Sequence, residues 1–344
     1  MGNIVYVEGS PYEIGYGIGE KFRDEVSQLI NLYKGFWTGV YGLTEGKLVE
    51  HAREVSKLIS KWNSSIAEEI RGLGDGAGVG IESATLLNAR YDITYMFRSR
   101  ALEGCTAIGI LPERSLEGET ILAQNWDYTA YVKDYSRLIH VRYDDGLEVI
   151  YHGETGVIGQ KGMNSSGVGI VFNAIPFLLL IKKVLKAGNM KEAVEAAINT
   201  PISVSGNIII AYKGGEVIDI EPVPGDYRII YPIQGILVHT NHLIGGWPGT
   251  FKDLTPHESG STFYRYYRAL RKLSSIEKPS IEDLKNIFRD HFSYPNSICA
   301  HKDPKDPMAI ETLASIILRV DKGIVEIAEG NPCKNRYESI ELHG

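Results

Sequence analysis

The sequence predicts an α+β fold of one domain, in which two antiparallel sheets pack face to face and helices cover the outer side of each. The first hundred residues have helical periodicity, and from Cys105 onwards the apolar pattern changes to a period of two. Turn sequences separate consecutive strands, as in β-hairpins. Several strands, such as residues 208–211, are apolar on both faces. We therefore expect both faces of each sheet to be covered.

Helical segments are expected before Cys105. They span residues 20–37, 45–62, 64–78 and 83–97. In the first segment, apolar side chains from Phe22 to Phe36 recur at helical spacing and form one stripe. The third ends in the glycine-rich stretch 72–80. We interpret this stretch as a helix terminus and not a nucleotide-binding loop, because no G-x-G-x-x-G register fits and no strand precedes it.

Strand pairs and further helices are expected after Cys105. The strand pairs are 105–113 with 120–128, 137–143 with 147–153, 155–164 with 167–175, and the hairpins 207–223, 227–241 and 313–333. The helices are 177–199, with a break at Gly188, 261–275 and 280–292. The sequence contains no internal repeat and no low-complexity linker, so we expect a single domain over residues 1–344.

Composition narrows the class of protein. The 344 residues are 43% hydrophobic and 23% charged, as in soluble globular proteins. A net charge of −7 gives no electrostatic support for nucleic-acid binding. The N-terminus has no signal-peptide pattern, and the most apolar run, residues 170–181, is too short to span a bilayer. We expect a cytoplasmic protein with no membrane partner; oligomeric state is left open, a homo-oligomer included.

Cys105 is a candidate nucleophile. Only a thiolate attacks well, and a free thiol has a pKa of about 8.5, so a base is needed. If the bond between Gly104 and Cys105 were cut, the new α-amine, with a pKa of about 7.7–8.0, could be that base. Gly104 suits such a bond because glycine tolerates strained backbone. The alternative interpretation of Cys105 is a small buried hydrophobic residue.

Six segments in order resemble the penicillin acyltransferase family of N-terminal-nucleophile hydrolases. They are GSPYEIGYGIGEKF (9–22), EGCT (103–106), QNWDY (124–128), GMNSSGVGIVFN (162–173), HTNH (239–242) and GNPC (330–333). The resemblance implies a four-layer αββα sandwich and self-cleavage between Gly104 and Cys105. Residues 1–104 would then be a mostly helical pro-segment, and residues 105–344 the chain that carries the nucleophile.

The resemblance also assigns roles to single residues. Cys105 matches the nucleophile, and Asp127 the acid that orients the free amine; otherwise Asp127 is a turn residue at a strand end. Asn241 matches a side chain that donates to the oxyanion. Asn173 matches a second oxyanion position through its backbone N–H, or else simply ends a strand.

Two further positions follow from the same resemblance. Arg265 matches a family arginine near the amine, with Arg268 as a rival position. Gln124 stands where bile acid hydrolases have an arginine, which argues against a bile-salt substrate and for the penicillin acyltransferase side.

No metal or cofactor is expected. His239 and His242 could be ligands, but a third ligand is not apparent, and residues three apart on a strand face opposite sides. Cys299 and Cys333 are interpreted as buried packing residues or as helpers at loop ends.

The sequence therefore predicts an enzyme. The Cys105 thiolate would attack a small acyl-amide or acyl-thioester, and water or an amine would take the acyl group from the acyl-enzyme. The alternative is an uncleaved, catalytically silent member of the same fold that binds acyl or peptide ligands.

Overall fold

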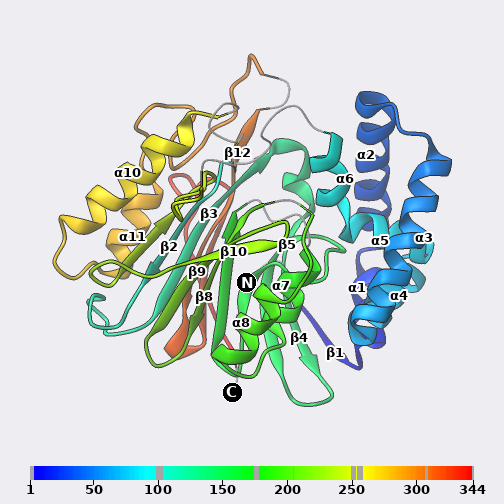
Figure 1. The fold of residues 1–344 in the computed structure, drawn as a ribbon, viewed down its shortest axis with the longest axis horizontal. Coiled ribbons are helices and arrows are strands. Elements are labelled where there is room, and N and C mark those ends of the chain that lie inside the picture. Colours follow the sequence, from blue (N-terminus) through cyan, green and yellow to red (C-terminus); the bar gives the residue numbers. More distant parts are fainter. Residues whose placement is uncertain are drawn as a thin grey trace.

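Two sheets lie face to face in the centre of the molecule, with helices on both outer sides (Figure 1). The computed structural model describes residues 4–97, 104–173, 178–203, 205–248, 253, 259–306 and 309–342. The predicted arrangement of two sheets between helical layers is confirmed. None of the described helices has the length and apolar character needed to cross a membrane.

The first sheet has eight strands in the order β1-β4-β5-β6-β7-β8-β9-β10. Their bounds are β1 Ile4–Gly9, β4 Ser136–Tyr143, β5 Glu148–Glu154, β6 Lys161–Asn164, β7 Val168–Asn173, β8 Asn207–Tyr212, β9 Glu216–Val223 and β10 Asp226–Ile230. Neighbouring strands are antiparallel except β1 and β4, which are parallel. The edge strand β1 lies in the N-terminal segment ahead of the first expected helix, and no strand was predicted there.

The second sheet has six strands in the order β11-β2-β3-β12-β13-β14. Their bounds are β2 Thr106–Ile110, β3 Ile121–Thr129, β11 Ile236–His239, β12 Ile310–Arg319, β13 Ile324–Glu329 and β14 Glu338–Glu341. One expected hairpin is wrong, because residues 227–241 supply β10 to the first sheet and β11 to the second. This segment crosses from one sheet to the other, and alternation alone does not indicate which sheet a strand joins.

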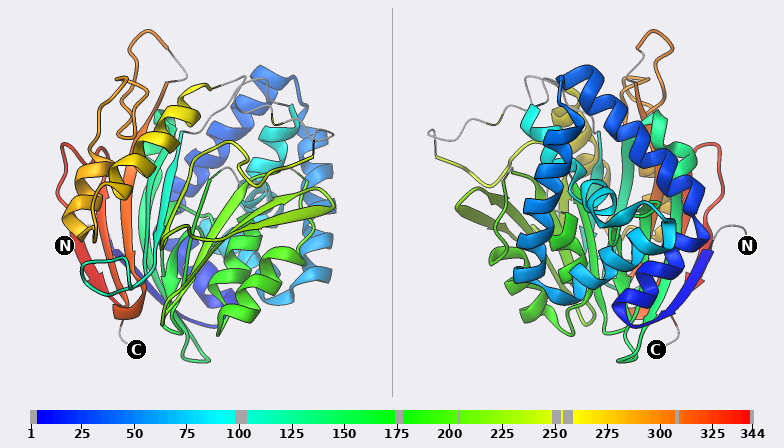
Figure 2. Two further views of the ribbon diagram at one scale, coloured as in Figure 1. Left: turned by 60° about the vertical axis from the view of Figure 1, so that its left-hand side comes forward. Right: turned by 90° about the vertical axis from the view of Figure 1, so that its right-hand side faces the viewer.

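Helices α1 to α8 form the layer on the eight-stranded sheet, and α10 and α11 form the layer on the six-stranded sheet (Figure 2). The first layer comprises α1 Pro11–Lys21, α2 Arg23–Tyr41, α3 Glu45–Trp62, α4 Ser64–Ala77, α5 Gly80–Asn88, α6 Arg90–Phe97, α7 Leu178–Leu185 and α8 Met190–Ile198. The second comprises α10 Ser261–Ser274 and α11 Ile281–Phe288. The expected helix 83–97 is thus divided into α5 and α6.

The two faces of the six-stranded sheet bury different sets of side chains. Because side chains alternate along a strand, Ile108 and Ile110 of β2 pack towards α10 and α11, whereas Gly109 lies against Val217 of the other sheet. Cys105 and Ala107 share the face of Gly109. The start of β2 therefore directs Cys105 into the space between the sheets.

Helices α1 and α4 approach each other backbone to backbone. A Cβ on Gly72 would collide with the Tyr12 carbonyl oxygen, and a Cβ on Gly15 would collide with that of Glu69. Helix α4 therefore continues through most of the glycine-rich stretch and ends only at Gly78, which has a positive φ of 71°. These glycines form a helix contact as well as a helix end.

Candidate active site

Gly104 and Cys105 lie immediately before β2 and alongside the end of β3. The Gly104 N–H donates to the Asp127 carbonyl oxygen at 3.2 Å, and the Cys105 thiol donates to the same oxygen at 3.6 Å. Cys105 is buried, with 2% of its surface exposed. The backbone of β3 thus determines the position of both the sulfur and the peptide bond in front of it.

Asp127 presents one oxygen of its carboxyl group to this bond. Its Oδ1 accepts a hydrogen bond from Thr312 Oγ1 at 2.6 Å, while Oδ2 is buried and has no hydrogen-bond partner among the described residues. A Cβ on Gly104 would lie 3.5 Å from Oδ2. Burial raises the pKa of Asp127 to about 8, although the Arg265 charge and the Thr312 hydrogen bond lower it. A cation placed beside Oδ2 would stabilise the ionised carboxylate.

Arg265 reaches the same place from α10. Its Nη1 donates to the Cys105 carbonyl oxygen at 2.5 Å and to Thr106 Oγ1 at 3.1 Å, and its Nη2 donates to Asn241 Oδ1 at 2.9 Å. The rival Arg268 instead pairs with Asp290 through two hydrogen bonds of 2.5 and 2.7 Å. Geometry therefore favours Arg265 over Arg268 as the arginine of this site.

Asn241 follows β11 and has a defined amide orientation. A guanidinium group can only donate hydrogen bonds, so the amide edge facing Arg265 must be the oxygen. The Nδ2 group then points away from Arg265; it is buried and has no hydrogen-bond partner among the described residues. The Asn241 backbone N–H donates to Thr262 Oγ1 at 3.0 Å, which anchors the residue to α10. Asn241 is thus connected to Cys105 through Arg265 and keeps an unpartnered donor, which is the kind of group that an oxyanion site requires.

Asn173 ends β7 in the other sheet and is linked to the site through Gln124. The Gln124 side chain crosses the space between the sheets, and its Nε2 donates to the Phe172 carbonyl oxygen and, at 3.2 Å, to Asn173 Oδ1. The backbone N–H of Asn173, which was expected to face an oxyanion, donates to Asn207 Oδ1 at 3.1 Å. In this arrangement that N–H is already engaged, so Asn241 offers the better placed donor.

His239 of the HTNH segment has both ring nitrogens engaged. His239 Nε2 lies 2.8 Å from Glu221 Oε1, and its Nδ1 lies 2.7 Å from the Thr240 carbonyl oxygen. Burial alone would lower the pKa of His239, but the Asp219 and Glu221 carboxylates raise it above its usual value. Both ring nitrogens of His239 are therefore used within the protein.

Two threonines support the site and were not predicted. The Thr312 hydroxyl of β12 donates a hydrogen bond to Asp127, and the Thr262 hydroxyl of α10 accepts one from the Asn241 backbone N–H. Each lies far along the chain from its partner, and no local motif distinguishes either from other threonines. Only the packing of β12 and α10 against the site identifies them.

An apolar cavity of about 340 Å³ opens at the end of β3. Tyr128 and Thr129, which directly follow Asp127, form part of its wall. The lining residues come from α2, α6, β3 and the turn after it: Leu32, Tyr33, Phe36, Val40, Thr94, Tyr128, Thr129, Tyr131 and Val132.

The sequence model of the acyl-coenzyme A:6-aminopenicillanic acid acyl-transferase family matches residues 115–334, which is well over half of the chain. The protein belongs to this family. It is therefore an enzyme of the acyltransferase and amidase kind. The match includes Asp127, Asn173, Asn241 and Arg265.

Relatives agree with this membership. The 40 kDa form of acyl-coenzyme A:6-aminopenicillanic-acid-acyltransferase from Emericella nidulans is 27% identical over 316 residues, which cover 88% of this chain and 85% of that protein. An uncharacterized protein from Archaeoglobus fulgidus is 22% identical over 196 residues, covering 50% of this chain and 33% of the relative.

Solved structures show a weaker likeness. Penicillin V acylase from Agrobacterium tumefaciens has a TM-score of 0.46 and 13% identity, covering 65% of this chain and 83% of that structure. A mutant of conjugated bile acid hydrolase from Clostridium perfringens has a TM-score of 0.42 and 13% identity, covering 69% and 97% respectively.

Proposed function

We propose that this family member is a self-processing cysteine amidohydrolase or acyltransferase, with the cut between Gly104 and Cys105. The observation that carries the proposal is the meeting of Asp127 with Gly104 and of Arg265 with Cys105, together with Asn241, which Arg265 holds. They come from β3, the segment after β11 and α10. A thiol, an unpartnered carboxyl oxygen and an unpartnered amide donor are the groups that such chemistry needs.

Processing begins with the Cys105 thiol. Its sulfur attacks the carbonyl carbon of Gly104, the C–N bond breaks, and the thiol proton passes to the nitrogen that becomes the amine of Cys105. The resulting thioester reacts with water, which leaves Gly104 with a carboxylate and Cys105 with a free thiol. Asp127 Oδ2 is placed beside this unit and would hold the new amine.

Turnover uses the same sulfur. The new amine accepts the thiol proton, and the thiolate attacks the carbonyl carbon of an acyl-amide or acyl-thioester. Asn241 Nδ2 would donate to the oxyanion, and the leaving group departs with the proton held by the amine. Water or an acceptor amine then takes the acyl group from the sulfur. The apolar cavity that begins at Tyr128 supports an apolar acyl group as the substrate portion bound next to the thiol.

Replacement of Cys105 tests this proposal. We expect Cys105→Ala to remain one chain of 38.2 kDa without turnover, whereas the wild-type protein separates into two fragments at Gly104 under denaturing conditions. Cys105→Ser should process slowly, because a hydroxyl is the poorer nucleophile. Intact mass and release of amine from a panel of acyl-amides are the measurements.

Two results would reject the proposal. One is amide hydrolysis by Cys105→Ala. The other is a wild-type chain that stays whole, resists iodoacetamide at Cys105 and binds acyl-amides without cleaving them, which would indicate the silent binding protein.

A further inference from the structure

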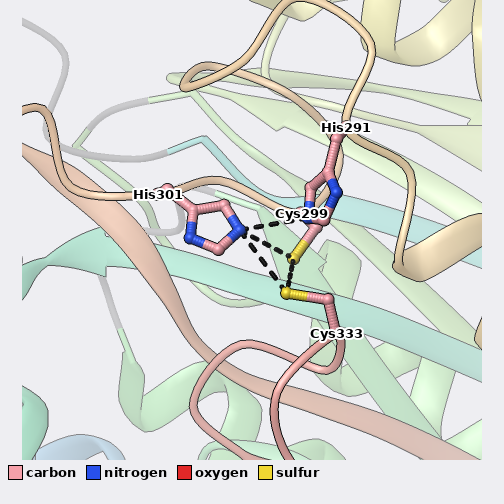
Figure 3. Close-up of side chains that lie close together, drawn as sticks. All are labelled: His291, Cys299, His301 and Cys333. Carbon is pink, nitrogen blue, oxygen red and sulfur yellow. Dashed lines mark hydrogen bonds between the residues drawn. The ribbon is translucent and has the colours of Figure 1, made fainter.

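Four potential metal ligands meet at the edge of the α10–α11 layer, outside the candidate active site (Figure 3). His291, Cys299 and His301 lie in the segment after α11, and Cys333 lies in the segment after β13. One ligand atom from each side chain lies within 4.8 Å of the other three. The cysteines are 34 positions apart, so only the fold brings this group together.

Four of the six distances between these atoms are close to the edges of a tetrahedron around one metal ion, and the other two are within 4.8 Å. The two sulfurs are 3.6 Å apart, and His301 Nε2 lies 3.6 Å from Cys299 Sγ and 3.5 Å from Cys333 Sγ. The two imidazole Nε2 atoms are 3.1 Å apart. Zinc–sulfur bonds are about 2.3 Å long and zinc–nitrogen bonds about 2.0–2.1 Å. At tetrahedral angles these lengths place two sulfurs roughly 3.8 Å apart, a sulfur and a nitrogen roughly 3.5 Å apart, and two nitrogens roughly 3.3 Å apart.

Hydrogen bonding alone does not account for this group. His301 Nε2 faces Cys299 Sγ, Cys333 Sγ and His291 Nε2 at once. A neutral ring nitrogen has either one proton or one lone pair, so it can make one good hydrogen bond and not three. A metal cation between the two sulfurs and the two imidazole nitrogens could accept a lone pair from each of them.

We propose that His291, Cys299, His301 and Cys333 bind one zinc ion in a closed structural site. Two thiolates and two imidazoles in tetrahedral arrangement form a ligand set that favours zinc over calcium or magnesium, which prefer oxygen ligands. Four protein ligands leave no open position, so the ion would have a structural and not a catalytic role.

The backbone around the ligands is held in place without the ion. The Cys299 N–H donates to the Asp290 carbonyl oxygen at 3.0 Å, and Ser297 Oγ donates to the Cys299 carbonyl oxygen at 2.7 Å. Asn331 Nδ2 donates to the Ala300 carbonyl oxygen at 2.6 Å, which connects the segment of Cys333 to that of Cys299 and His301. Such prior order reduces the entropy lost when a metal binds.

The zinc site has a direct connection to Asp127. Ala300 lies between two of the ligands, and its N–H donates to Thr312 Oγ1 at 2.9 Å. The Thr312 hydroxyl in turn donates to Asp127 Oδ1 at 2.6 Å. The ion would therefore hold the segment that orients this carboxyl group. This consequence rests on the proposed function, whereas the site itself does not.

The metal content of the purified full-length protein tests the site. We expect about one zinc ion per chain by plasma mass spectrometry in the wild type and in Cys105→Ser, and loss of zinc from Cys333→Ser. Cys105→Ser is the matched control, since it removes a cysteine outside the group. Cobalt(II) in place of zinc should give the visible bands of a tetrahedral ion and thiolate-to-cobalt charge-transfer bands, both absent from Cys333→Ser.

His291→Ala keeps the test valid if Cys333→Ser does not fold. His291 is exposed, and its removal leaves three ligands, so this variant should fold and should lose zinc to a lower chelator concentration than the wild type does. The proposal is overturned if protein produced with added zinc contains no zinc and gives no cobalt spectrum. A Cys299–Cys333 disulfide in the freshly purified protein would overturn it as well. Zinc content and turnover are measured separately. A Cys105→Ser variant that loses turnover but keeps its zinc would therefore test the proposed function without affecting the zinc site.

Discussion

Arg265 determines which way the Asn241 amide faces, and through this it determines where a hydrogen-bond donor is available. Its guanidinium group spans the Cys105 carbonyl oxygen and Asn241 Oδ1. A lysine could not hold both acceptors in one plane. The residue that positions the donor therefore lies on α10, while the donor itself lies after β11.

Removal of the Asn241 donor should affect the rate more than substrate binding. We expect Asn241→Ala to reduce kcat by about 10²–10³-fold with little change in KM, because a donor aimed at an oxyanion acts in the transition state. Steady-state kinetics with an acyl-amide give both values. The exposed Asn199→Ala is the control and should keep the wild-type kcat. A large change in KM alone would assign Asn241 to substrate binding.

Asp127 should make stability depend on pH in the uncut chain. Its pKa of about 8 in the folded protein is above the value of about 3.9 for an unfolded aspartate. The unfolded state therefore loses its proton first, and the free energy of unfolding decreases as pH rises between these two values. The decrease amounts to about 1.4 kcal/mol for each unit by which the pKa is raised.

Comparison of Cys105→Ala with Cys105→Ala/Asp127→Asn isolates this effect. The first variant carries no thiol to start the cut and so no new ammonium group to oppose the shift. Between about pH 5 and pH 8 its free energy of unfolding in urea should fall by a few kcal/mol more than that of the double variant. Parallel pH profiles for the two variants would contradict the raised pKa.

At the scale of elements, the contact between α1 and α4 depends on glycines that lie against the backbone of the facing helix. A Cβ on Gly15 or Gly19 of α1 would collide with the backbone of α4, and a Cβ on Gly72 or Gly76 of α4 would collide with the backbone of α1. A Cβ added at Gly39 of α2, in contrast, would have no atom within 4 Å, so this glycine occupies an open helical position. Substitution by alanine should lower the stability of the folded protein at the first kind of glycine and raise it at the second.

Gly72→Ala should destabilise the protein by about 1–3 kcal/mol or more, because the added Cβ must displace the Tyr12 backbone. Gly39→Ala should stabilise it by up to about 1 kcal/mol, because alanine has the higher helix propensity. Urea unfolding monitored by circular dichroism measures both. Equal effects of the two substitutions would rule out a close contact between α1 and α4.

Periodicity predicted the helices and strands whose pattern is local, and it failed where a distant partner decides the outcome. Helix α3 was predicted with its observed bounds from its apolar face, and the structure adds a Thr44 cap at its start. Helix α1 was not predicted, although Ser10 and Glu13 form a capping box and Pro11 occupies the first helical position. The end of α4 was predicted within one residue, whereas the sheet to which β11 belongs depends on packing that alternation does not encode.

In the candidate site, too, some residues could be predicted from the sequence and others depend on distant partners. Cys105 could be singled out by chemistry, and Asp127, Asn241 and Arg265 only by resemblance. Their convergence depends on the order of strands in the second sheet and on the placement of α10. The supporting threonines, and the meeting of Cys299 with Cys333, required the structure because the partners are distant along the chain.

At the scale of the whole molecule, buried ion pairs join the segment before Gly104 to the segment after it. Arg90 pairs with Glu154, and Glu69 pairs with Lys182 at 2.6 Å, and all four side chains are almost fully buried. These pairs lie within one apolar core that both segments share, and separation of the segments would expose that core to water, which is unfavourable.

We therefore expect the two fragments to remain together after processing. Native mass spectrometry and gel filtration should detect a single particle with the mass of the full chain, while denaturing electrophoresis resolves two bands. Cys105→Ala, which stays whole, provides the reference elution volume. Elution of a separate fragment of residues 105–344 under native conditions would contradict this expectation.

Strand β1 has a consequence for any attempt to produce the nucleophile-bearing fragment alone. Ile4–Gly9 precedes the proposed cut, yet it completes the hydrogen bonds of β4 along one margin of the larger sheet. A fragment starting at Cys105 would expose that margin as a row of open amide and carbonyl groups, which is a template for adding strands from other molecules. Recombinant 105–344 should thus aggregate on its own and become recoverable when 1–104 is co-expressed.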